Sequence, residues 1–189
     1  LSTGDHVLYI TKQFYADAAG KIAALIRQEF ASKISIGDNL GRGIHDIAFV
    51  IDSTISMRSI LEEHRSEIKA LAAEAVASGG RIALFEFRDV NIYPTKKLCD
   101  FGCTLDEFNA QIDAIVANWG GDAYESPLPA LMFTMNSLDW RQEVDNSIIL
   151  VTDGKYRDPD YDDTPLEMVI ERSRNLTSSS SRSANNLSP

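Results

Sequence analysis

The sequence predicts a doubly wound α/β fold, in which a mostly parallel sheet lies between two layers of helices. Strand-like and helix-like segments alternate along the chain, as expected when successive strands run parallel. The segments IAFVI at 47–51 and SIILV at 147–151 are almost continuously apolar. Such runs are typical of strands covered on both faces by helices. At 189 residues, the chain suits one domain with extensions.

The elements of this domain can be placed from hydrophobic spacing, caps and breakers. Strands are predicted at 46–52, 81–89 and 146–152, and an exposed loop or edge strand at 90–101. Helices are predicted at 57–77, 104–118, 127–138 and 164–176. Thr104 and Glu107 form a capping-box pattern at the start of the second helix, and glycines at 79 and 80 end the first.

The two ends of the chain differ from this domain. HVLYI at 6–10 predicts a strand or extended segment, and the residues after it show the spacing of an amphipathic helix. The Ser-rich end cannot bury enough apolar surface to offset the entropy of ordering. We therefore expect an N-terminal extension over 1–42, the main domain over 43–176, and a disordered tail or linker over 177–189.

Charge and hydropathy exclude some classes of partner. A formal net charge of −10 argues against binding to a nucleic-acid backbone and favours cations or basic partners. No apolar run reaches the roughly 18 residues that span a bilayer. The chain opens with LSTGDH, without an initiator Met or a signal peptide, so we expect a trimmed or mature segment of a larger multidomain protein.

The two cysteines of the chain, Cys99 and Cys103, lie four residues apart in CDFGC. Two thiols without nearby histidines are too few for a structural zinc site. A close pair around a glycine-containing bend favours a disulfide in an oxidising compartment.

Polar residues follow two of the predicted strands, at their carboxyl ends. In an open parallel sheet, ligands bind outside the carboxyl ends of the strands. Asp52 ends one strand and is followed by Thr54 and Ser56, and Asp153 ends another. The loop GGDAYES at 120–126 adds Asp122 and Glu125. Carboxylate and hydroxyl oxygens suit a hard divalent cation such as magnesium.

A purely structural interpretation of the same residues is also available. Thr54 or Ser56 can cap the helix that starts near Met57, and Asp153-Gly154 is an ordinary turn sequence. Each feature alone is weak evidence of a site. Their predicted convergence at one edge of the sheet favours the metal site.

Three motifs in this order resemble von Willebrand factor A domains. DSTIS at 52–56, within VIDSTISM, resembles the Asp-x-Thr-x-Ser form of the metal ion-dependent adhesion site of that family. LVTDG at 150–154 resembles the strand and turn that carry its last aspartate. GGDAYE at 120–125 and FEFRDVN at 85–91 resemble segments of the hemicentin-like and integrin β-like members. The resemblance covers about residues 44–176.

This resemblance implies a site and a function. Asp52, Thr54 and Ser56 would bind the metal directly or through water, with Asp153 behind them or bridged by a water. Similarity to integrin β-like loops favours Glu125 as the loop ligand, and Asp122 is the other candidate. The cation would be Mg²⁺, or else Mn²⁺ or Ca²⁺, and would bridge to an Asp or Glu of a protein partner. Many such domains are extracellular or secreted, which favours that location here, and the intracellular members of the family are the alternative.

The sequence departs from the family pattern in two respects. Ile55 and Tyr124 stand at the ligand rim where glycine and proline are usual. After the helix ending near residue 176, the family continues with a further strand and helix that this chain lacks. Either the domain is truncated at its C-terminus, or HVLYI and the N-terminal helix take the missing places.

Two other functions remain open at this stage. A degenerate, metal-free structural domain would use the polar turns only to cap helices. A phosphatase resembling the haloacid dehalogenases would use Asp52 as nucleophile, but Thr54 stands where its acid is needed. The Lys155 that follows Asp153 lies outside a matching context. The sequence therefore favours a binding module over an enzyme.

Overall fold

The computed structural model describes residues 6–10, 44–120, 124–142 and 144–173. A five-stranded sheet forms its centre, in the order β1-β6-β2-β3-β4. The strands are β1 (His6–Ile10), β2 (His45–Asp52), β3 (Arg81–Phe87), β4 (Lys96–Cys99) and β6 (Asp145–Val151). All neighbours pair in parallel except β4, which runs antiparallel to β3 at the sheet edge. The predicted fold class, an open and mostly parallel sheet flanked by helices, is confirmed.

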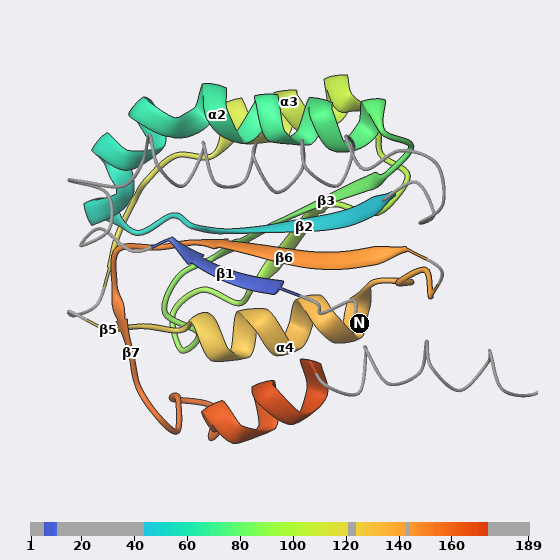
Figure 1. Cartoon of the computed structure of the whole chain (residues 1–189). Coiled ribbons are helices and arrows are strands. Elements are labelled where there is room, and N and C mark those ends of the chain that lie inside the picture. Colours follow the sequence, from blue (N-terminus) through green and yellow to red (C-terminus); the bar gives the residue numbers. More distant parts are fainter. Residues whose placement is uncertain (1–5, 11–43, 121–123, 143, 174–189) are drawn as a thin grey trace, which may run out of the picture.

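Helices cover both faces of this sheet (Figure 1). On one face lie α2 (Arg58–Ala77), which follows the short 3-10 helix η1 (Ile55–Met57), and α3 (Leu105–Ala114). On the other face lie α4 (Pro127–Ser137) and the helical residues 166–173. The predicted capping box forms at α3, where Thr104 accepts from the Glu107 amide and Glu107 accepts from the Thr104 amide. No helix in the described part of the chain combines the length and apolarity needed to cross a membrane.

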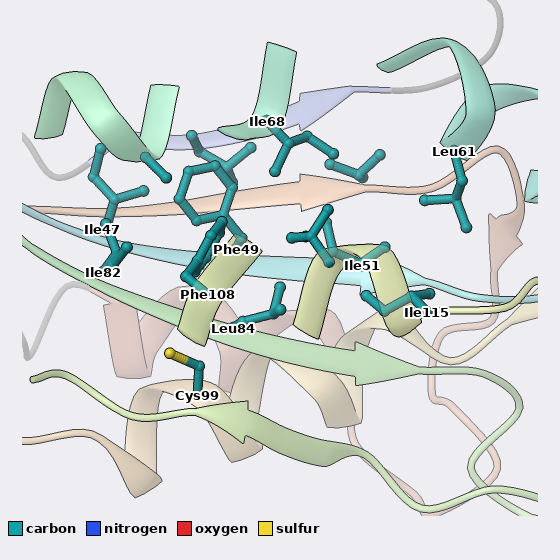
Figure 2. Close-up of a cluster of buried hydrophobic side chains, with 14 of the residues drawn as sticks. Ile47, Phe49, Ile51, Leu61, Ile68, Ile82, Leu84, Cys99, Phe108 and Ile115 are labelled. Atoms are coloured by element: carbon teal, nitrogen blue, oxygen red, sulfur yellow. The ribbon is translucent and has the colours of Figure 1, made fainter. Parts of the chain in front are cut away.

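The central strand β2 supplies both halves of the core. Ile47, Phe49 and Ile51 belong to the cluster under α2 and α3, where Phe49 packs edge-on against Phe108 with ring centroids 5.2 Å apart (Figure 2). Ala48 and Val50 belong to the cluster against α4. Because successive residues of a strand face opposite sides, an unbroken apolar run is needed to fill both clusters.

The N-terminal strand belongs to the same sheet. β1 pairs in parallel with β6, from His6 opposite Ser147 to Ile10 opposite Val151. It therefore occupies the sheet position beyond β6, where a strand later in the chain was expected by analogy. The N-terminal helix and the Ser-rich tail predicted from the sequence lie outside the described residues, and the domain boundaries stay a prediction.

Cys99 and Cys103 form a disulfide, with their Cα atoms 6.0 Å apart. Cys99, the last residue of β4, is buried in the cluster under α2 and α3. The bond closes the bend that leads from β4 into α3, so it fixes the edge strand to the helix layer.

A buried ion pair lies near the amino end of β2. Asp46 is 0% exposed, and its Oδ2 accepts from Nε of Arg81 at 3.0 Å and from Nε of Arg141 at 3.0 Å. Burial alone would raise the pKa of Asp46, but the hydrogen bonds and positive charges of the two arginines outweigh it and lower the pKa. The charge is therefore compensated where it is buried.

We predict that Asp46→Asn lowers the free energy of unfolding by about 3 kcal/mol at pH 7, because two arginines lose their shared carboxylate. The folded pKa of Asp46 lies below its ordinary value of 3.8. This stabilisation is thus complete above about pH 4 and is lost as the pH falls through the folded pKa. Urea unfolding of both proteins between pH 3 and pH 7 measures the difference. A difference that stayed constant down to pH 3 would contradict the assignment.

Candidate metal site at the carboxyl ends of the strands

The carboxylate of Asp52 lies at the carboxyl end of β2 and is 0% exposed. Its Oδ1 accepts from the amide of Thr54 at 2.8 Å and from Oγ1 of Thr54 at 2.7 Å. Its Oδ2 accepts from Oγ1 of Thr152 at 2.7 Å. Among the described residues, no lysine or arginine forms an ion pair with it. Burial raises the pKa of Asp52 to about 6, although these hydrogen bonds oppose the rise.

A row of side-chain oxygens leads from Asp52, at the end of β2, to Asp153, which follows the neighbouring strand β6. Oγ1 of Thr54 lies 3.3 Å from Oγ of Ser56, and Ser56 donates to Oδ1 of Asp153 at 2.8 Å. Thr54 occupies the N-cap position of η1 but its side chain makes no capping bond, and Met57 is the N-cap residue of α2. The hydroxyl of Thr54 therefore serves this oxygen cluster and not the helix.

Glu125 approaches the cluster from a separate two-stranded sheet. β5 (Tyr124–Glu125) pairs in parallel with β7 (Lys155–Tyr156), beside the end of the main sheet where the chain leaves β2 for α2 (Figure 1, left). Glu125 is 5% exposed, and its Oε2 is buried without a hydrogen-bond partner. A Cβ at Gly154 would lie 2.1 Å from Cγ of Glu125, so the glycine after Asp153 makes room for this side chain.

The electrostatic environment of Glu125 opposes its ionisation. Burial raises the pKa of Glu125 to about 8, and the negative charges of Asp52, Asp89 and Asp153 add to the rise. A hydrogen bond with the side chain of Thr54 acts in the opposite direction. Two buried acids thus face one another across Thr54, and both are costly to ionise without a nearby positive charge.

The structure brings together most of the residues predicted from the sequence. Asp52, Thr54, Ser56, Asp153 and Glu125 converge, whereas Asp122 lies outside the described residues. At the rim, Ile55 and Tyr124 are both exposed, and the ring of Tyr124 stacks on the guanidinium of Arg157 at 4.4 Å.

Sequence reasoning missed several residues that support the site. Thr152 donates to Asp52, and its position directly after β6, between that strand and Asp153, was the available signal. Ser126 accepts from the amide of Val90 at 3.0 Å and donates to Asp160 at 2.9 Å, so it joins three loops beside Glu125. No sequence pattern marked Asp160, because it contacts Ser126 only through the tertiary fold.

The donor set fits a hard divalent cation. All of its members are carboxylate or hydroxyl oxygens, and one carboxylate oxygen of Glu125 is buried without a partner. Within the described residues, no three His, Cys, Asp or Glu side chains form a ready-made metal cage. Magnesium is often bound by one or two carboxylates and completes its coordination with water. A site built from two acids and two hydroxyls is compatible with that behaviour.

Comparison with known proteins addresses the fold. No protein-family model matches the sequence, and no curated protein matches it either. Among solved structures, proximal thread matrix protein 1 (PTMP1) from the mussel byssus, described with a zinc-occupied MIDAS motif, matches with a TM-score of 0.55. The match is 20% identical and covers 72% of this chain.

The chain has the von Willebrand factor A fold. The matched region is 34% of the length of the PTMP1 chain, and an identity of 20% supports the shared fold alone. Within this von Willebrand factor A fold, the oxygen cluster lies at the carboxyl ends of β2 and β6, the edge at which open α/β sheets bind ligands.

We predict that Glu125→Gln stabilises the metal-free protein. The folded pKa of about 8 lies above the ordinary 4.5, so ionised Glu125 destabilises the fold increasingly as the pH rises from 4.5 through 8. In EDTA, the variant should exceed wild type by roughly 2–4 kcal/mol in unfolding free energy at pH 8 and match it near pH 4.5.

Chemical denaturation across this pH range measures the effect. Glu62→Gln, which removes an exposed carboxylate from α2, is the matched control and should not reproduce it. A Glu125→Gln protein that was less stable than wild type at pH 8 would show that the ionised carboxylate is already compensated.

Proposed function

We propose that this domain is a metal-dependent protein-binding module and not an enzyme. Asp52, Thr54, Ser56 and Glu125 would hold a divalent cation, with Asp153 orienting Ser56 from behind. The cation would supply positive charge and an open coordination position for an Asp or Glu carboxylate of a protein partner. Mg²⁺ suits this all-oxygen set, and Mn²⁺ or Ca²⁺ are alternatives.

One contrast within β2 carries this proposal. The strand has a fully buried aspartate near each end, Asp46 and Asp52. Two arginines compensate Asp46 and its pKa is lowered, whereas only hydroxyl and amide groups meet Asp52 and its pKa is raised. A buried carboxylate without a cation is costly. The charge of Asp46 is compensated by arginines and the charge of Asp52 is not. We therefore expect Asp52 to be retained for a function that a bound cation completes.

The arrangement gives less support to the other two functions. A phosphatase needs a general acid near its nucleophile. Thr54 occupies the expected position, and its hydroxyl donates a hydrogen bond to Asp52 itself. A degenerate structural domain is expected to have lost its ligands. Here the oxygen set converges, so the departure at Ile55 concerns the rim and not the ligands.

Two observations bear on the cellular location of the protein. The disulfide of Cys99 and Cys103 favours an oxidising compartment, and the similar fold of PTMP1 comes from a byssal matrix protein. On these grounds we propose that the domain belongs to an extracellular or secreted protein.

A magnesium titration tests the site. We predict that millimolar Mg²⁺ raises the melting temperature of EDTA-treated wild type by several degrees, since a ligand at 100 times its Kd stabilises by about 2.7 kcal/mol. Asp52→Ala should abolish this response, and Ser56→Ala should weaken magnesium binding about tenfold or more. Differential scanning fluorimetry and calorimetry give the two quantities.

The matched control is Ser59→Ala, which removes an exposed hydroxyl one turn further along on α2. It should respond to magnesium as wild type does. An Asp52→Ala protein that was stabilised by magnesium as much as wild type would rule out metal binding at this site.

A further inference from the structure

A pocket of about 350 Å³ adjoins the candidate metal site. It is lined by Arg88, Asp89, Ile92, Tyr93, Trp119 and Gly120. A Cβ at Gly120 would lie 3.6 Å from Cβ of Thr54 and 3.9 Å from Cγ2 of Ile55, so the pocket wall directly borders residues 52–56, the proposed metal-binding loop. A partner that approached a metal held by these residues would therefore pass beside this pocket.

The pocket offers mainly apolar surface. Trp119 is 74% exposed and Ile92 is 63% exposed. The charge of Arg88 is engaged, because its guanidinium bonds Glu86 at 3.1 Å and Ser53 at 2.8 Å and stacks 4.3 Å from the Tyr93 ring. The hydroxyl of Tyr93 also donates to Glu86, at 2.9 Å. Asp89, the other charged residue of the lining, is only 3% exposed and so contributes little accessible surface. The pocket therefore favours an apolar occupant over a charged one.

Trp119 is held in an unusual backbone conformation. Its φ is 51°, in the left-handed region that disfavours residues with a Cβ. Its carbonyl accepts from the amide of Ile55 at 2.9 Å, and the neighbouring amide of Asn118 donates to the carbonyl of Ser53 at 3.0 Å. These two hydrogen bonds hold the backbone of Trp119 in its strained conformation and leave the indole exposed at the rim of the proposed metal site. Backbone strain of this kind clusters at binding sites.

We propose that the pocket receives a large apolar side chain of the partner, close in sequence to the carboxylate that approaches the metal. The inference rests on the proposed function, because the pocket is continuous with the metal site through Gly120 and Ile55. The partner segment is thus an Asp or Glu flanked within a few residues by Leu, Phe or Trp. Tryptophan is enriched among the residues that dominate interface energies. On this account, the exposed Ile55 extends the apolar surface instead of obstructing the site.

Short synthetic peptides test this specificity. The probes are capped hexapeptides of Gly and Ser with one Glu and, two residues away, Phe, Leu, Gly or Lys. With magnesium present, the Phe and Leu peptides should bind wild type at least about tenfold more tightly than the Gly peptide, because a large apolar side chain is buried. The Lys peptide should show no such gain.

The informative variant is Trp119→Gly. Glycine adopts positive φ without strain, so this variant should fold with equal or higher melting temperature while losing the indole. It should lose the preference for the Phe peptide and bind the Gly peptide as wild type does. In NMR spectra of wild type, the indole signal of Trp119 should shift with the Phe peptide. The half-buried Trp140, whose Nε1 donates to the carbonyl of Met135, serves as the internal reference.

The remaining outcomes separate this inference from the proposed function. Equal, magnesium-dependent affinity for the Phe and Gly peptides would overturn the pocket and leave the metal bridge intact. An apolar preference that persisted in EDTA would support the pocket and contradict the bridge, and the absence of any binding at millimolar peptide would contradict both. Magnesium-dependent self-association that Trp119→Gly abolished would assign the pocket to a second copy of the chain and overturn the proposed partner.

Discussion

The arrangement depends on a carboxylate that is buried without a positive charge beside it. Asp52 is placed there by the core, because the apolar residues before it fix β2 at the centre of the sheet and leave the carboxylate at the strand end. Hydroxyls of Thr54 and Thr152 orient both of its oxygens but supply no charge. The oxygens are therefore positioned at the expense of stability in the metal-free state, a trade that is common at binding sites.

The surrounding loops are shaped around this carboxylate. Gly154 makes room for Glu125, and the pairing of β5 with β7 holds that acid against Thr54. Backbone hydrogen bonds from the amides of Asn118 and Ile55 join the loop of Trp119 to residues 52–56, the proposed metal-binding loop. The buried acids, the hydroxyl of Thr54 and the exposed indole are thus joined through neighbouring loops, so metal binding and partner selection are expected to be coupled through a few short contacts.

The sequence predicted the sheet and most of the site for a simple reason. Apolar periodicity located the strands. Because the carboxyl ends of parallel strands meet at one edge of a sheet, the pattern also predicted that Asp52 and Asp153 lie together. It could not predict the ion pair of Asp46 with Arg141, because 95 residues separate the partners. The left-handed backbone of Trp119 was equally hidden, since that conformation is imposed by tertiary hydrogen bonds against the preference of the residue.

The most direct test is a carbon-13 NMR titration of the side-chain carboxyl groups, with and without magnesium. In metal-free protein, Asp52 should titrate near pH 6 and Glu125 near pH 8. The pKa of Asp46 should lie below its ordinary value of 3.8. Magnesium should lower the pKa of Asp52 and Glu125 and leave Asp46 unchanged. An Asp52 that titrated at or below its ordinary value without metal, or that did not respond to magnesium, would contradict the account.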